Sequence, residues 1–250
     1  MSGVIEMLTR MLIDGRETDV EVDLHLVDEV LVPVLEQVGA AAQPHRRRYV
    51  FLVAPPGTGK STLAAILKDR ARHLDLDVVG MDGFHHAQAY LESHHLERGG
   101  ERVPLSAVKG APETFDVDGL ARQLELGRTR STCWPRYDRV LHDVVPGAEP
   151  VEAGLVLVEG NYLLLDEPGW SELSDHSDFN IFLEPDADAL RERLVSRKVR
   201  GGLSRSAATE FYDRSDRHNV ERVLAGTDRS KVDLLLHLDI DGATERRDRP

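Results

Sequence analysis

The stretch Ala54-Pro55-Pro56-Gly57-Thr58-Gly59-Lys60-Ser61-Thr62 decides the fold of this chain. It follows a short apolar run, Tyr49–Val53, and opens a segment, 61–72, with the character of a helix. Strand, glycine-rich turn and helix in this order are the context that identifies a phosphate-binding P-loop. Gly57 and Gly59 let backbone N–H groups turn inward around phosphate oxygens, and the helix adds its positive N-terminal dipole.

The side chains of this loop predict a site for ATP and Mg²⁺. The predicted nucleotide-binding residues of the loop are Pro56, Gly57, Thr58, Gly59, Lys60, Ser61 and Thr62. The Lys60 ammonium would reach the β- and γ-phosphates, and the Ser61 hydroxyl would ligate Mg²⁺. The motif usually opens with glycine, and here Ala54 stands in that place. Alanine costs little there provided that its φ is negative.

Short apolar strands alternate with helical segments along the rest of the chain. The predicted strands are Tyr49–Val53, Leu76–Met81, Gly154–Val158, Asn180–Leu183 and Val232–Ile240, and the helices between them include Val117–Leu126 and Ala187–Val199. Such alternation predicts an α/β protein with a mostly parallel sheet. Ligands of these sheets bind at the carboxyl ends of the strands, so residues that directly follow a strand are the first candidates for the site.

Composition excludes several classes of partner. The 250 residues carry 31 basic and 44 acidic side chains, a formal net charge of −13. This balance argues against nucleic acid or an anionic membrane as the main partner, because both require a basic surface. The single cysteine, Cys133, cannot form an intrachain disulfide and fits a reducing compartment. No apolar run approaches the roughly 18 residues of a membrane span, so we expect a cytoplasmic protein.

The chain divides by composition near residue 45. Residues 1–45 are expected to be an N-terminal helical extension, with an amphipathic helix over 22–38 that Pro33 kinks or shortens. The small-residue stretch Gly39–Pro44 and the basic run Arg46–Arg48 follow this helix. Residues 46–250 are expected to be the domain that carries the P-loop.

Two acids follow predicted strands. Asp82 is a candidate catalytic residue because a carboxylate near the P-loop can accept the proton of an attacking hydroxyl, and Gly83 beside it would leave room for a substrate. The alternative is that Asp82 is a turn residue that caps the next segment. Glu159 ends an apolar strand, as does the acid that holds Mg²⁺ in many P-loop proteins. The alternative for Glu159 is a solvent-facing residue at a strand end.

A basic stripe marks the predicted helix Ala187–Val199. Arg193, Arg197 and Arg200 share one face, whereas Leu190 and Leu194 lie on another. A basic stripe in an acidic protein suggests binding of phosphates, and Gly201-Gly202 after it would hinge a lid over the nucleotide. A solvated face paired with nearby acids is the alternative.

Two histidine pairs lie between the second strand and Lys109. His85 is a candidate for contact with the substrate, whereas His94 and His95 are expected to be loop residues. No cysteine or acid surrounds these pairs at the spacing of a zinc site, so a structural metal is not expected.

In order along the chain, the P-loop is followed by Met81-Asp82-Gly83-Phe84-His85, by Lys109-Gly110-Ala111-Pro112-Glu113-Thr114-Phe115-Asp116, by Tyr137-Asp138-Arg139 and by Glu159-Gly160-Asn161-Tyr162-Leu163-Leu164. This set resembles the phosphoribulokinase/uridine kinase superfamily, and more closely its bacterial kinases related to pantothenate kinase and labelled nucleoside/nucleotide or fructose-transport kinases. The resemblance covers about residues 46–240. It implies a P-loop NTPase fold of three layers, α/β/α, with a helical lid.

The resemblance also implies an activity and the residues that perform it. It implies transfer of the γ-phosphate of Mg·ATP to a hydroxyl of a small metabolite, with Lys60 and Asp82 catalytic and Ser61 and Glu159 on the metal. Arg193 and Arg197 of the basic stripe are the further candidates for contact with the nucleotide. The implied acceptor pocket contains His85, Lys109, Phe115, Arg136, Tyr137 and Asn219. The segment between His85 and Lys109 is longer than in close relatives, and His86-Ala87-Gln88 replaces their Asp-Asn, so this region is where the choice of acceptor would differ.

The sequence leaves the acceptor open. We rank a sugar or sugar-like polyol first, a pantothenate-like acid second and a nucleoside third. Two other classes remain: a P-loop ATPase switch without an acceptor, and a regulatory nucleotide-binding protein. Relatives in this superfamily form homodimers, although no interface signature is visible in the chain.

Overall fold

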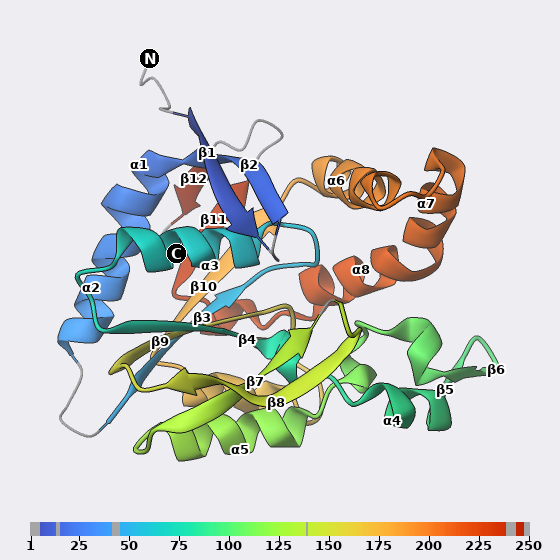
Figure 1. Cartoon of the computed structure of the whole chain (residues 1–250), viewed down its shortest axis with the longest axis horizontal. Coiled ribbons are helices and arrows are strands. Elements are labelled where there is room, and N and C mark those ends of the chain that lie inside the picture. The colour runs from blue at the N-terminus through green and yellow to red at the C-terminus, as the bar shows by residue number, and fades with distance from the viewer. Residues whose placement is uncertain (1–5, 14–15, 42–45, 139, 239–243, 248–250) are drawn as a thin grey trace.

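A central six-stranded sheet organises the computed structural model, which describes residues 6–13, 16–41, 46–138, 140–238 and 244–247 (Figure 1). Its order is β12-β11-β10-β3-β9-β4. The strands are β3 (Arg48–Val53), β4 (Leu76–Gly80), β9 (Leu155–Gly160), β10 (Phe179–Pro185), β11 (Leu234–Leu238) and β12 (Thr244–Arg247). All are parallel except β12, which confirms the predicted α/β fold. Residues 239–240 of the fifth predicted strand lie outside the described residues.

The central strands of the sheet are buried. In β3 the residues from Tyr49 to Val53 are at most 1% exposed, because helices cover both faces and β9 and β10 flank the strand. Strands buried on both faces are continuous apolar runs, which made β3 and β9 predictable. The predicted buried strand β4 is instead a half-buried edge strand in which only Val79 is buried, because β9 is its one neighbour.

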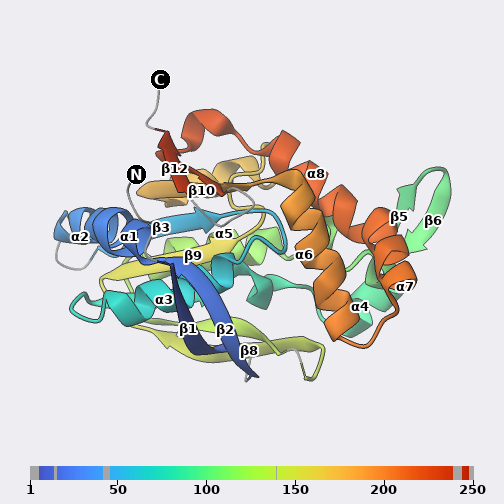
Figure 2. The ribbon, with the colours of Figure 1, turned by 90° about the horizontal axis from the view of Figure 1, so that it is seen from above.

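Helices form a layer on each face of the sheet (Figures 1 and 2). On one face, α3 (Lys60–Arg70) and the N-terminal helix share a core with Val50 and Leu157. On the other face, α5 (Val117–Gly127) inserts Leu120 and Leu124 into a second core that holds Phe51 and Val158. The predicted three-layer α/β/α arrangement is confirmed.

The first 45 residues differ from the predicted helical extension. Strands β1 (Glu6–Ile13) and β2 (Arg16–Asp23) form an antiparallel hairpin that the helical periodicity did not predict. A continuous helix follows, made of α1 (Leu24–Leu26), a π-helical turn Val27–Leu31 and α2 (Val32–Ala40). The π-turn ends two residues before Pro33, whose missing N–H cannot close an ordinary turn. This helix packs on the sheet and is part of its core.

Two hairpins extend beyond the sheet and were not predicted. Strand β5 (His95–Arg98) pairs with β6 (Glu101–Pro104), and β7 (Thr132–Asp138) pairs with β8 (Asp143–Val151). His95 therefore lies in a strand, and His94 directly follows α4 (Gln88–Ser93). The predicted loop assignment is therefore correct for His94, which lies between α4 and β5, and wrong for His95.

The β7–β8 hairpin packs against the 3-10 turn Met81–Phe84 that follows β4. The Trp134 ring meets the Phe84 ring edge-on at 5.1 Å, and Trp134 Nε1 donates to the Gly80 carbonyl at 2.9 Å. A Cβ on Gly83 would lie 1.9 Å from the Pro135 carbonyl oxygen. Gly83 therefore makes room for the backbone of β7. It also lines the cavity beside Asp82, so its expected role of leaving room for a substrate stays a prediction.

Three helices form a unit at the side of the sheet, α6 (Ala187–Arg200), α7 (Arg205–Phe211) and α8 (Arg217–Gly226). They share a small core of their own that includes Leu190, Leu194 and Tyr212. Gly202, with φ +104°, allows the sharp turn between α6 and α7. Within the described part of the chain, no helix is both long enough and apolar enough to cross a membrane.

Candidate active site

The phosphate loop joins β3 to α3, as predicted. Gly57 and Gly59 have φ of +84° and +99°, values that only glycine adopts without strain. The Thr58 hydroxyl donates to the Pro55 carbonyl at 2.9 Å and closes the loop on itself. Ala54, in the place of the usual glycine, is fully buried and has a negative φ, so its methyl group causes no strain.

The candidate catalytic lysine, the candidate metal serine and the second acid meet at one point. The Ser61 hydroxyl donates to Glu159 Oε1 at 2.7 Å, and Lys60 Nζ lies 3.8 Å from Glu159 Oε2. Glu159 reaches this point because it pairs in register with Leu52 of β3 and Gly80 of β4. The predicted partnership of Ser61 and Glu159 is thus present in the geometry, and Glu159 is not a solvent-facing residue.

A hydroxyl and a carboxylate at this point fit Mg²⁺. Both are hard oxygen ligands, and Mg²⁺ usually takes one or two protein ligands and completes its coordination with phosphate oxygens and water. Among the described residues no group of three histidine, cysteine or acidic side chains could hold a metal ion. Any Mg²⁺ at Ser61 and Glu159 would therefore depend on the nucleotide for its remaining ligands.

Asp82 shares a cavity of about 300 Å³ with Ser61 and Glu159. It follows β4 within the turn that packs on β7, and its backbone carbonyl accepts from the His85 ring at 2.9 Å. Arg136 and Tyr137 of β7 line the same cavity. The structure therefore places the candidate base, the candidate metal ligands and two candidate acceptor residues around one space.

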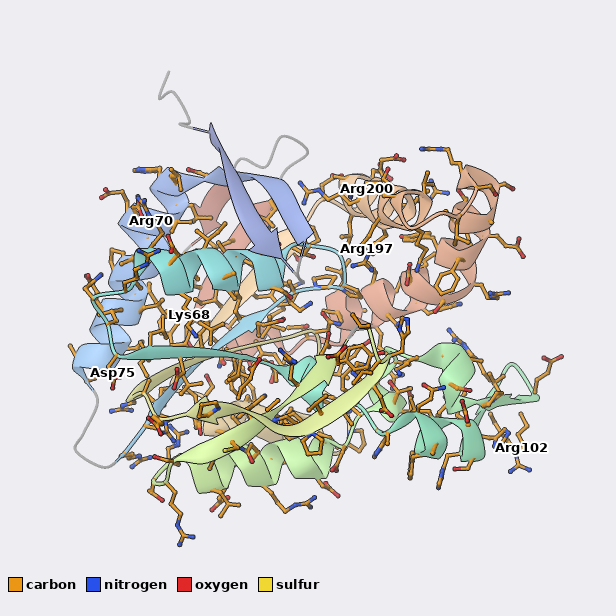
Figure 3. All side chains as sticks on the ribbon, in the orientation of Figure 1. Lys68, Arg70, Asp75, Arg102, Arg197 and Arg200 are labelled. Atoms are coloured by element: carbon orange, nitrogen blue, oxygen red, sulfur yellow. The ribbon has the colours of Figure 1, made fainter. Side chains whose placement is uncertain are left out.

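Sequence reasoning missed two charged residues of this cavity, Lys68 and Glu149. Lys68 lies two turns after Ser61 on α3, a spacing that could have identified it (Figure 3). Glu149 is brought there by its pairing with Trp134 across the β7–β8 hairpin, which no sequence pattern indicated.

The other predicted acceptor residues form a stack beside the cavity. The His85 ring lies 3.9 Å from the Phe115 ring and 5.3 Å from the Tyr137 ring, measured between centroids. Burial lowers the pKa of His85 despite the nearby Asp82 charge, which favours a neutral ring. Lys109 Nζ lies 4.9 Å over Tyr137 and donates to Gln88 and to the His142 carbonyl.

Phe115 and Asn219 lie apart from this cavity. Phe115 is 4% exposed and packs edge-on against Tyr162 and Trp170, so it supports His85 from the core. Asn219 lines a second cavity of about 300 Å³ together with Arg98 and Arg222. The described structure does not bring Asn219 into the lining of the Asp82 cavity.

The α6 helix lies against the phosphate loop. A Cβ on Gly57 would approach Leu194 to 2.6 Å and Leu190 to 3.3 Å, so the apolar face of α6 packs on the loop. Arg193 and Arg197 are exposed, and Figure 3 shows Arg197 and Arg200 on this helix. The helix therefore contacts the loop through its leucines, whereas the contact of Arg193 and Arg197 with the nucleotide and the movement of a lid stay predictions.

Comparison with known proteins agrees with this geometry. The sequence profile of the "Phosphoribulokinase / Uridine kinase family" matches residues 50–231. "Uncharacterized protein YggC" of Escherichia coli (strain K12) is 42% identical in an alignment of 224 positions that covers 87% of this chain and 91% of that protein. A pantothenate kinase of Mycolicibacterium gilvum (strain PYR-GCK) is 26% identical in an alignment of 259 positions that covers 91% of this chain and 80% of that one.

A solved structure shows the same fold. The protein from Silicibacter sp. TM1040 described as a "putative fructose transport system kinase" superposes with a TM-score of 0.69 at 35% identity, covering 79% of this chain and 95% of that one. The profile match over most of the chain and these relatives confirm the resemblance read from the motifs. The chain belongs to the phosphoribulokinase/uridine kinase family, whose members are ATP-dependent kinases that phosphorylate small molecules.

Proposed function

We propose that this protein transfers the γ-phosphate of ATP to a hydroxyl of a small, uncharged polyhydroxy metabolite such as a sugar. The observation that carries the proposal is the single cavity that Ser61, Glu159 and Asp82 line together. It joins the nucleotide side of the site to Asp82, a carboxylate that is not one of the two candidate Mg²⁺ ligands. A nucleotide switch without an acceptor would have no use for that carboxylate.

The residues of the candidate active site have separate roles in this transfer. The loop N–H groups and Lys60 hold the phosphates, and Lys60 offsets charge on the transferring group. Mg²⁺ bound with the nucleotide at Ser61 and Glu159 would neutralise charge on the β- and γ-phosphates. Asp82 orients the acceptor hydroxyl and takes its proton as the oxygen attacks phosphorus. Arg193 and Arg197 would approach the phosphates when the α6–α8 unit closes.

The charges of the cavity favour a neutral acceptor. Lys68 and Arg136 face three carboxylates, those of Asp82, Glu149 and Glu159, so the lining has no surplus of positive charge. Glu159 is paired with Lys60, so Asp82 and Glu149 balance Lys68 and Arg136. A polyhydroxy acceptor can donate to the carboxylates and accept from the cations, whereas an acid would find no surplus of positive charge to bind it. The description of the Silicibacter relative as a fructose transport system kinase supports ranking a sugar first among the acceptors.

A pantothenate-like acid is the second candidate and a nucleoside the third. Arg136 is half exposed, with 55% of its side chain accessible, and among the described residues its one ion pair is a long one, with Asp138 at 3.7 Å. It is therefore free to turn and bind a carboxylate, as a pantothenate kinase would require. A cytoplasmic location, a homodimer and the division of the chain into an N-terminal extension, 1–45, and a kinase domain, 46–250, remain predictions.

The test is ADP release from Mg·ATP with a panel of hexoses, polyols, hydroxy acids, pantothenate and nucleosides. We expect a sugar or polyol to stimulate ADP release, and Asp82→Asn to lower turnover by about 10²–10⁴-fold with little change in ATP affinity. Asp118→Asn, on the exposed first turn of α5, removes the same charge and should leave turnover unchanged. Wild-type turnover in Asp82→Asn would overturn the assignment of the base.

A further inference from the structure

We infer that the basic run Arg46–Arg48 and the turn after α5 form a second anion site, built for the phosphate group of a small phosphorylated metabolite. The site is a cavity of about 280 Å³ at the amino end of β3. Six residues of extended strand separate it from the phosphate loop, roughly 20 Å. It is therefore distinct from the nucleotide and acceptor sites, and it does not depend on the proposed function.

Arg47 gives this cavity a buried positive charge. It is 7% exposed, and its guanidinium donates to the carbonyls of Gly127, Arg130, Val151 and Ala153. Carbonyl dipoles satisfy its N–H groups but carry no net charge, and no described carboxylate forms an ion pair with it. The same bonds fix the turn after α5 to the turn before β9, so the walls of the cavity are held in place.

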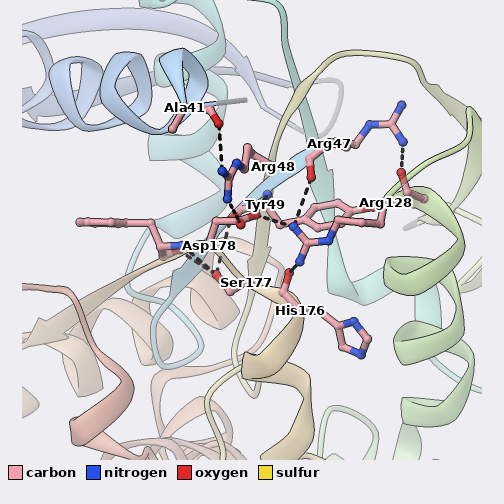
Figure 4. Close-up of polar contacts among 10 residues, drawn as sticks. Ala41, Arg47, Arg48, Tyr49, Arg128, His176, Ser177 and Asp178 are labelled. Carbon is pink, nitrogen blue, oxygen red and sulfur yellow. Dashed lines mark hydrogen bonds and ion pairs between the residues drawn. The ribbon is translucent and has the colours of Figure 1, made fainter. Parts of the chain in front are cut away.

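The neighbouring ion pairs do not cancel this charge. Arg48 and Arg128 both bind one carboxylate, that of Asp178 (Figure 4). Burial opposes the charge of Asp178, yet the Tyr49 N–H and the two guanidinium groups hold its pKa below the usual range. Asp178 is therefore ionised, and one carboxylate is shared between two guanidinium groups. Arg128 also donates to the carbonyls of Arg47 and His176, which ties this cluster to the cavity.

Two arginines at the mouth of the cavity remain available to a ligand. Arg46 and Arg130 line it and are exposed, and no described carboxylate forms an ion pair with either. The acids of the lining are Asp75, which accepts from the Gly154 N–H at 2.7 Å, and Glu152. With Arg47 and Arg128 the lining holds four guanidinium groups against two carboxylates, in a chain whose net charge is −13.

This chemistry selects a phosphate ester rather than a cation or a neutral ligand. Planar guanidinium groups bind phosphate oxygens in pairs, and the hydroxyls of Thr129 and Ser131 in the same lining add neutral donors. A cavity of about 280 Å³ accommodates a phosphate group with a few carbons attached, but not a polymer. The ligand class is therefore a small phosphorylated metabolite.

The test uses inorganic phosphate and glycerol 3-phosphate as probes, with glycerol as the uncharged counterpart. Isothermal titration calorimetry is carried out on the full chain with and without a saturating non-hydrolysable Mg·ATP analogue, which occupies the phosphate loop. We expect one equivalent of phosphate or glycerol 3-phosphate to bind when the analogue is present, and no binding of glycerol.

Variants assign the binding to the cavity. Arg46→Ala/Arg130→Ala should weaken binding by about tenfold or more, because both groups are expected to contact phosphate oxygens. Arg102→Ala/Arg122→Ala removes two exposed arginines elsewhere and should bind as the wild type does. All four side chains are exposed, and a thermal melt checks that each variant is folded. Absence of binding with the analogue present, equal binding by the cavity variant, or equal weakening in the control would overturn the inference.

Discussion

Substitution of Gly83 by alanine tests how the acceptor side of the site is assembled. The added Cβ would lie 1.9 Å from the Pro135 carbonyl oxygen and 2.5 Å from its carbonyl carbon. Both are backbone atoms of β7, so no side-chain rotation can relieve the contact. Restoring a separation of 3.0 Å requires β7 to move by about 1.1 Å. Such overpacking costs about 3 kcal/mol, the upper end of its usual range, and lowers the Tm of a chain of this size by about 6–12 °C.

The same displacement moves Arg136 and Tyr137, which line the cavity with Asp82. A misplacement of about 1 Å can lower turnover by about 100-fold, so we expect Gly83→Ala to lose activity as well as stability. The matched control is Gly39→Ala in α2, whose Cβ would meet only a Leu155 methyl at 3.5 Å and should be neutral or stabilise by about 0.5–1 kcal/mol. Thermal unfolding and acceptor-dependent ADP release measure both effects. A Gly83→Ala protein with the Tm and turnover of the wild type would refute this packing.

Four further predictions follow from the contacts. Lys60→Ala should abolish ADP formation with circular dichroism unchanged, because Lys60 is the cation of the phosphate loop that would offset charge on the β- and γ-phosphates. Glu159→Gln should raise the Mg²⁺ concentration for half-maximal rate by about tenfold, measured by Mg²⁺ titration. Arg47→Met should cost at least about 3 kcal/mol in urea unfolding, because four carbonyls lose a buried donor. Burial lowers the folded-state pKa of His85, so protonation favours the unfolded chain and stability falls as pH drops below about 6.5. His85→Asn should show a smaller loss of unfolding free energy between pH 7.5 and 5.5, and an equal loss would contradict this.

The centre of the fold could be predicted because its signals are local. Tyr49–Val53 is apolar at every position, and the glycines that follow it need the positive φ that they adopt. The β7–β8 hairpin could not be predicted in this way, because Pro135, Gly147 and Pro150 interrupt the alternation typical of strands. The N-terminal hairpin was missed because the helical periodicity of 22–38 begins within its second strand.

The residues of the candidate site likewise divide into those with a local sequence signal and those without one. Asp82 and Glu159 could be found because each directly follows an apolar run, and parallel strands bring their carboxyl ends together. The position of Glu149 in the cavity depends on the pairing of β7 with β8. The second anion site depends on carbonyls that bind Arg47 from segments about 80 to 106 residues away along the chain. Contacts of that kind follow from the packed fold and leave no pattern along the chain.

The central claim is transfer of phosphate to an acceptor, and the fate of the γ-phosphate tests it most directly. The protein is incubated with γ-labelled Mg·ATP and the acceptor panel, and the labelled products are separated. The account predicts that the label appears in an organic phosphate monoester, and that Asp82→Asn removes this product while still binding ATP. Label found only in inorganic phosphate, at a rate that no acceptor changes, would contradict the account and identify the protein as an ATPase.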